Sequence, residues 1–356
     1  MIYCLLEVKK LLQEKLFLVF IFLCLCLNIG LCFCNQGTRS EVNRMAENGI
    51  CPQGEKIYDT LDSRALGSFY YNERYISSSV LNQWMKAKYE SLQQSIELLD
   101  EQNADLSPFA GEITASVHQA LFAYQLKALL LECIVFISLL SLKTYFVEQQ
   151  MKTDAFIYSS RRGRKIARDK LWASGIACFI YCFALIVISL TIFFARWNFQ
   201  NLWNSNMASS FNYVIDSSDS IWRKPFITWT SFTLKEYFIC SLLLMAGIIV
   251  AWWLLTNMIS LLVRNSVAGG LILVAILCLP FFGLILLPKL QLAWPYYLDT
   301  LTLSTVMYCN QWWFTDMGNY TLFAYQEVWV VIVHLLLMMI GIWVVLRYFE
   351  RRKELA

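Results

Sequence analysis

Five long windows of the sequence contain no charged residue, and this pattern restricts the chain to a small set of folds. The windows are Leu16–Cys34, Leu171–Ala195, Tyr237–Val263, Ser266–Pro288 and Val328–Leu346. Each is long enough to cross a hydrocarbon core, which needs about 20 apolar residues in helical form. A sixth window, Ala128–Val147, contains Glu132 and Lys143, but Lys143 lies near one end and can extend to the interface. We therefore predict an all-α integral membrane protein with six transmembrane helices.

Composition agrees with a membrane protein. Charged residues make up 15% of the chain, against about 25% in soluble domains, and the mean hydropathy is +0.50. The first window has an alternative interpretation as a signal peptide, with Lys9, Lys10 and Lys15 as its basic flank. Its apolar run exceeds the roughly 7–15 residues of such a peptide, and no small-residue cleavage site follows. We interpret it as an uncleaved first helix.

The basic residues are concentrated in alternate connections. They fill the N-terminal segment 1–15, the connection 149–170 with seven Lys or Arg, the short turn at Arg264, and the C-terminal tail 347–356. The segment 36–125 instead contains twelve Asp or Glu and seven Lys or Arg. Because short basic connections remain in the cytoplasm, both termini are predicted to be cytoplasmic. The charge of the connection 149–170 has two interpretations. Either it only sets the topology, or it also docks a partner.

These assignments divide the chain into twelve segments. The cytoplasmic ones are an amphipathic N-terminal segment, the basic connection and the tail, at 1–15, 148–170 and 347–356. The membrane helices are 16–34, 128–147, 171–195, 237–263, 266–288 and 328–346. The outer segments are 35–127, 196–236 and 289–327, the last of which is a candidate re-entrant loop.

The first outer segment contains two helical patterns. The apolar residues Met85, Tyr89, Leu92, Ile96 and Leu99 form one stripe, and Lys86, Lys88 and other polar residues fall mostly on the remaining faces. After Pro108, the pattern Ile113–Tyr124 leads into the second membrane helix. We predict an extracytoplasmic helical hairpin between helices 1 and 2. Its stripe is expected to be buried within the hairpin, with a partner site as the alternative.

Aromatic residues crowd the other two outer segments. Trp197, Trp203, Trp222 and Trp229 flank one, and Trp294, Tyr296, Tyr297, Trp312 and Trp313 lie in the other. Tryptophan and tyrosine collect at membrane interfaces because an apolar ring with a polar edge suits that zone. We therefore expect both segments to lie in the outer leaflet. A site that stacks a sugar or a drug is the alternative.

Few residues could carry chemistry within this chain. Most of the twelve cysteines lie in apolar windows, and only Cys51 and Cys309 are clearly in outer segments, where they are candidates for a disulfide. No metal site is expected. Glu132 is a candidate for a translocation path, because a carboxylate within a membrane helix is costly. The chain contains no phosphate-binding loop motif, and no nucleophile–base pair is evident. We therefore expect no enzyme activity in the chain itself.

The stretch FVEQQMKTDAFIYSSRRGRKIARDKLWASG resembles the cytoplasmic loop between the second and third helices of ABC-2-type exporter permeases. In that family, an acidic residue, a Thr, an Arg and a Lys recur at similar spacing, and here Glu148, Thr153, Arg164 and Lys170 match them. Lys152 replaces the usual Gly before the Thr, and the Pro often found before the Arg is missing. Six helices and an amphipathic N-terminus also agree with the family.

The resemblance implies a membrane subunit of an ABC exporter in a bacterial plasma membrane. This subunit would move a hydrophobic or amphipathic substrate, such as a peptide, antibiotic or lipid, out of the cell. It implies two copies of a separate ATPase subunit, which bind ATP and Mg, and a second permease chain, identical or paralogous. No cofactor in this chain and no nucleic acid are expected. The residues predicted to couple to the ATPase are Glu148, Thr153, Arg161, Arg164, Arg168 and Lys170. The alternative function is a non-transporting membrane sensor or scaffold whose outer hairpin binds a ligand or partner.

Overall fold

The computed structural model describes most of the chain. The described residues are 2–33, 39–40, 43, 58, 63, 79–102, 118–151, 153, 165–200, 202–208, 226–263, 265–317 and 320–351. Within them the regular structure is helical, with two isolated β-bridges and no strand.

Six of the described helices are long and apolar enough to cross a membrane. They are α2 (Lys15–Phe33), α7 (Leu126–Gln150, preceded by a π-helical turn, Ala120–Gln125), α9 (Ile166–Arg196), α11 (Leu234–Leu262), α12 (Ser266–Lys289) and α15 (Gln326–Arg351). The predicted number of spans is confirmed, and the protein is a multi-pass helical membrane protein.

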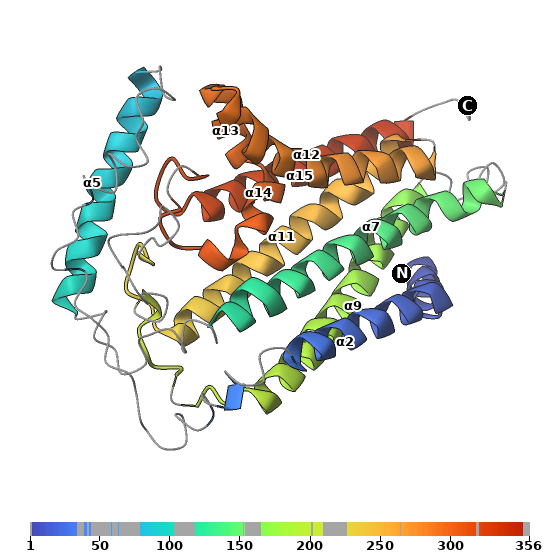
Figure 1. Cartoon of the computed structure of the whole chain (residues 1–356). Helices are drawn as coiled ribbons and strands as arrows, with labels where there is room; N and C mark the ends of the chain where they lie inside the picture. The colour runs from blue at the N-terminus through green and yellow to red at the C-terminus, as the bar shows by residue number, and fades with distance from the viewer. Residues whose placement is uncertain are drawn as a thin grey trace.

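Helix α11 lies at the centre of the bundle, in contact with α7, α9, α12 and α15 (Figure 1). Small residues allow the close approach of α15. A Cβ atom added at Gly247 would lie 2.9 Å from Val331 Cγ1, and one at Gly341 would lie 2.9 Å from Met258 Sδ. Close backbone approach through small residues is a common basis of helix packing in membranes.

Local signals fix the limits of α11 and α12. Thr233 caps α11 by accepting a hydrogen bond from Glu236 N, while the Glu236 side chain accepts one from Thr233 N. This reciprocal capping satisfies amide groups that the first helical turn leaves unpaired. Asn265 then caps α12 through Val267 N. The two spans are therefore joined by a very short turn.

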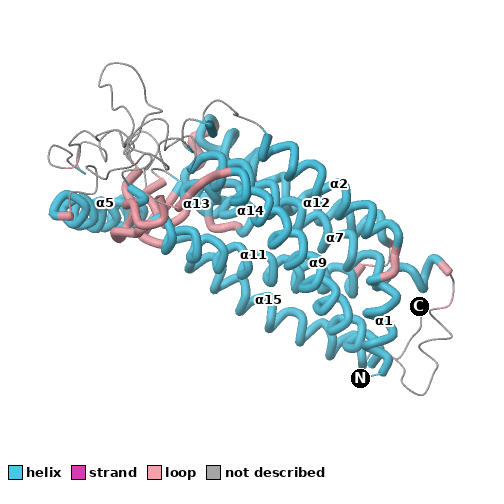
Figure 2. Tube along the Cα trace, turned by 90° about the horizontal axis from the view of Figure 1, so that it is seen from below, coloured by secondary structure: helices cyan, strands magenta, loops and turns pink. Residues whose placement is uncertain are grey.

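The two ends of the bundle carry different parts of the chain (Figure 2). We call the end that carries both chain termini the terminal end. There, the short helix α1 (Ile2–Leu12) packs against α9. We call the opposite end the loop end, and it carries α5 (Ser79–Glu101).

Two short helices fold back from the loop end along α12. They are α13 (Ala293–Thr300) and α14 (Leu303–Tyr308). Ser304 Oγ donates to Ile276 O and Tyr308 Oη donates to Leu277 O, each at 2.8 Å. Ile276 is 13 residues before Lys289, the last residue of α12, so the chain returns about 20 Å along that helix.

The apolar stripe of α5 is buried as expected, and its partners among the described residues come from other segments of the loop end. It packs against Trp229, Tyr296, Tyr297 and Leu322 of the loop end. The second arm of the expected hairpin is not confirmed, because Ile113 and Val117 lie outside the described residues and residues 118–125 lead directly into α7.

The aromatic side chains of the loop end are divided between protein and surface. Trp197, Trp229 and Trp313 are at most 5% exposed and pack inside the protein. These three rings do not face the surrounding interface, because neighbouring aromatic and apolar side chains cover them. The expected position of the two segments in the outer leaflet stays a prediction. Trp294, by contrast, is 46% exposed. Trp222 lies outside the described residues.

Candidate functional site

Two of the predicted coupling residues form a buried ion pair at the terminal end. Lys170 Nζ lies 2.5 Å from Glu148 Oε2, with side-chain exposures of 2% and 8%. The ammonium group also donates to Thr144 O at 3.0 Å. These contacts join the last turns of α7 to the first turn of α9.

This pair stabilises the arrangement of α7 and α9 rather than presenting charge to solvent. Breaking a buried ion pair by removing one partner typically costs about 3–5 kcal/mol, because the remaining charge is left uncompensated. The sequence prediction treated Glu148 and Lys170 as separate docking residues. The structure brings them together and leaves neither with an exposed charged group.

The other predicted coupling residues have different positions. Thr153 N and Thr153 Oγ1 both donate to Glu148 O, at 2.9 and 3.3 Å, which closes the turn after α7. Arg168 is exposed and its guanidinium lies 2.6 Å from Glu350 Oε1, which connects α9 to the end of α15. Arg161 and Arg164 lie outside the described residues.

Glu132 belongs to a ladder of polar side chains between α2 and α7. Its Oε2 accepts a hydrogen bond of 2.6 Å from Asn28 Nδ2. Asn28 Oδ1 in turn accepts one of 2.7 Å from Gln125 Nε2, and Cys32 Sγ lies 3.7 Å from Gln125 Oε1. Glu132 Oε1 is buried and has no hydrogen-bond partner among the described residues. The ladder therefore holds one carboxylate oxygen uncommitted inside a membrane span.

A second polar network connects three spans in the half of the bundle nearer the terminal end. Asn257 of α11 accepts a hydrogen bond from Ser174 Oγ of α9 at 3.1 Å, and it donates to Ser141 Oγ of α7 at 3.2 Å. Ser141 Oγ also lies 2.9 Å from Thr256 Oγ1. Hydrogen bonds between helices in a bilayer contribute on average about 0.6 kcal/mol each. This network stabilises the packing of α7, α9 and α11.

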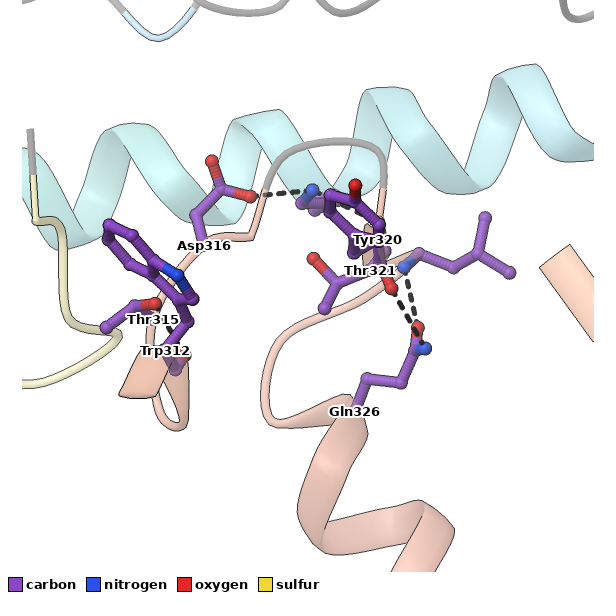
Figure 3. A network of polar contacts seen from close by, with 8 residues as sticks. Trp312, Thr315, Asp316, Tyr320, Thr321 and Gln326 are labelled. Atoms are coloured by element: carbon purple, nitrogen blue, oxygen red, sulfur yellow. Dashed lines mark hydrogen bonds and ion pairs between the residues drawn. The ribbon is translucent and has the colours of Figure 1, made fainter. Parts of the chain in front are cut away.

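The loop end contains a second buried ion pair, which sequence analysis missed. Lys88 Nζ of α5 lies 2.6 Å from Asp316 Oδ1, and both side chains are fully buried. Lys88 also donates to Thr321 O at 3.0 Å. Figure 3 shows Asp316 and Thr321 beside α5. The prediction placed Lys88 among the polar positions outside the stripe. It lies three residues after Met85 and four before Leu92, and this helical spacing could have placed it on the buried face.

Burial changes the titration of several loop-end groups. It lowers the pKa of His118, which stacks beside Phe199, to about 3. It raises the pKa of Asp299 to about 6 and that of Tyr297 to about 12. A neutral histidine and a readily protonated carboxyl group are what burial favours, because it disfavours the charged form.

The last predictions concern the two outer cysteines and metal ligands. Cys309 is partly buried, and burial raises the pKa of its thiol to about 11. Cys51 lies outside the described residues, so their pairing stays a prediction. Within the described part of the chain, no group of three or more His, Cys, Asp or Glu side chains could hold a metal ion.

With these positions established, the chain was compared with known proteins. It matched no protein-family model, no curated protein and no solved structure.

Proposed function

We propose that the chain is the permease subunit of an ATP-driven ABC exporter in a bacterial plasma membrane. A separate ATPase subunit in two copies would supply the energy, and a second permease chain would complete the transport path. The observation that carries the proposal is the set of ion pairs that hold the helices on either side of the basic connection 148–170. Its flanking helices are fixed to each other by Glu148 and Lys170, and Arg168 links α9 to α15. A force applied to the connection would therefore reach three membrane helices together.

The orientation of the proposed permease follows from the distribution of its basic residues. The terminal end carries the basic residues, so it is the cytoplasmic end of the proposed permease. Helix α1 would lie as an amphipathic helix in the cytoplasmic interface, and α5 would stand outside the cell. Glu132, with one uncommitted carboxylate oxygen inside a span, is the residue that we propose for the path of a peptide, antibiotic or lipid.

Glu148 and Lys170 are committed to each other and Arg168 to Glu350, so Arg161 and Arg164 are the arginines that we assign to the partner. Arginine forms bidentate pairs with carboxylates that lysine cannot reproduce.

The test is a charge-conserving double substitution. A tagged chain is purified from its native membrane, and the co-purifying chain with a phosphate-binding loop is quantified together with Mg-ATP hydrolysis. Arg161→Lys/Arg164→Lys should reduce both, whereas the matched control Lys165→Arg should not. Unchanged binding and hydrolysis in the double variant, with normal membrane insertion, would mean that the charge serves topology alone.

A second candidate function rests on a groove beside α5. This groove has a volume of about 290 Å³ and is lined by Trp84, Ser91 and Phe323, among others. Trp84 is 48% exposed. Such a site fits a non-transporting sensor that binds a ligand through α5. Trp84→Ala separates the two candidate functions. A sensor should lose its response to the ligand in this variant, whereas a transporter should keep coupled ATP hydrolysis by its partner ATPase.

A further inference from the structure

An open groove of about 510 Å³ lies at the terminal end, where α1 turns into α2. It is lined by Leu6, Lys9, Lys10, Gln13, Glu14 and Lys15. Three of these six side chains are basic and one is acidic. Its volume is in the range of small-ligand sites in proteins, which is about 300–1,000 Å³.

The acidic groups near the groove are already engaged. Glu14 Oε2 lies 3.3 Å from Lys143 Nζ of α7, outside the groove. Glu7 Oε2 lies 3.7 Å from Lys10 Nζ. Within the described residues, Lys9 and Lys15 form no ion pair with an acidic side chain. The groove therefore has a net positive charge and two ammonium groups available to an anion.

Contacts with α7 and α9 hold the backbone around the groove in place. Tyr181 Oη of α9 donates to Leu12 O at 2.8 Å. Phe17 is fully buried and packs edge-on against Phe136, with centroids 5.4 Å apart. These contacts fix the turn between α1 and α2, so the lysines project from a preorganised corner rather than from a loose chain end.

The position of the groove relative to the membrane indicates the kind of anion. Lys15 is the first residue of α2, which places it at the level of the lipid headgroups. Leu5, Leu6 and Leu16 are each more than 50% exposed around the lysines. A ligand with an anionic head and apolar chains would satisfy the lysines and the leucines together. A soluble anion would leave the leucines uncovered.

We propose that this groove binds the headgroup of an anionic phospholipid, with the phosphate between Lys9 and Lys15 and the acyl chains along the exposed leucines. Basic pockets beside membrane helices are suited to anionic headgroups, and each nearby Lys adds to the attraction. The site is independent of the proposed transport function, because it requires only that the protein lies in a bilayer.

The experiment compares two lipids that differ only in headgroup. The purified full-length chain in detergent is titrated with phosphatidylglycerol or phosphatidylcholine of identical acyl chains, and bound lipid is measured by native mass spectrometry. The wild type should prefer phosphatidylglycerol. Lys9→Gln/Lys15→Gln should weaken phosphatidylglycerol binding roughly 30-fold and leave phosphatidylcholine binding unchanged. Both lysines are exposed, so the fold should survive, and the melting temperature checks this.

A matched control removes one charge elsewhere at the same end. Lys165→Gln alters an exposed lysine outside the groove and should keep the preference. Equal loss in this control, or no loss in the double variant, would overturn the proposal. Displacement of phosphatidylglycerol by millimolar inorganic phosphate would also overturn it, because the groove would then recognise a free anion. Leu6→Gln provides a second test, since weaker binding with every lysine intact would support the position of the acyl chains.

Discussion

Replacing Lys88 by Met is expected to release α5 from the loop end. Lys88 Nζ lies 2.6 Å from Asp316 Oδ1, and neither side chain is exposed. The same ammonium donates to Thr321 O at 3.0 Å. Methionine preserves most of the side-chain volume but removes the charge. Asp316 would then remain buried without its counter-charge.

The size of the effect follows from this burial. Removing one partner of a buried ion pair costs about 3–5 kcal/mol, which is roughly two to three and a half orders of magnitude in an equilibrium constant. The apolar stripe of α5, including Met85 and Leu92, would be retained. We therefore expect local detachment of α5 rather than unfolding of the membrane bundle.

Hydrogen exchange of the α5 amides measures this detachment directly. Lys88→Met should lower their protection by at least about a hundredfold and leave the amides of α11 unchanged. Lys86→Met is the matched control, because Lys86 is two residues away and exposed. The double variant Lys88→Met/Asp316→Leu should recover most of the protection, since an apolar pair often replaces a buried ion pair at little cost. Equal protection in Lys88→Met and Lys86→Met would refute the reasoning.

Three further predictions concern other parts of the structure. Burial lowers the pKa of His118 from 6.5 to about 3. The unfolded chain therefore binds a proton that the folded chain does not, and the free energy of unfolding should fall as pH decreases from 6.5 towards 3. In thermal melts, the melting temperature of His118→Gln should fall less steeply with pH than that of the wild type. Burial raises the pKa of Asp299 from 3.8 to about 6. Protonation of Asp299 therefore favours folding as pH falls from 6 towards 3.8. Asp299→Asn should raise the melting temperature at pH 7 but not at pH 3.5. Gly247→Leu would drive a side chain into Val331, which a Cβ already approaches at 2.9 Å, and should cost about 1–3 kcal/mol. Gly30→Ala is the control in the same melts, and it should not lower the melting temperature because there is open space at its Cβ.

The number of membrane spans could be predicted because it depends on a property of single segments. A charge-free apolar window must be buried in lipid or protein whatever its neighbours are. The stripe of α5 was predictable for a similar reason, because helical spacing alone defines its buried face. In both cases the sequence specifies that a surface is covered without specifying what covers it. For the hairpin, the described residues show only part of that cover, which includes Trp229 and Leu322 of the loop end, and its second arm stays a prediction.

The charged contacts could not be predicted, because they join residues that are distant in sequence. Lys88 and Asp316 are 228 residues apart, and Asn28 and Glu132 are 104 residues apart. A lysine is also usually solvated, so its burial is apparent only once its partner is known. For Glu148 and Lys170 the family resemblance indicated partner contacts, whereas the packing of α7 on α9 pairs the two residues with each other.

The proposed permease function is tested most directly by crosslinking in living cells from residue 164, in the basic connection. A photoreactive amino acid replaces Arg164, and the same replacement at Lys86 of α5 serves as the control on the opposite end of the bundle. After illumination, the account predicts a covalent adduct between position 164 and a chain with a phosphate-binding loop, and no such adduct from position 86. Adducts with an ATPase from position 86 and none from position 164, at equal expression and membrane insertion, would contradict it.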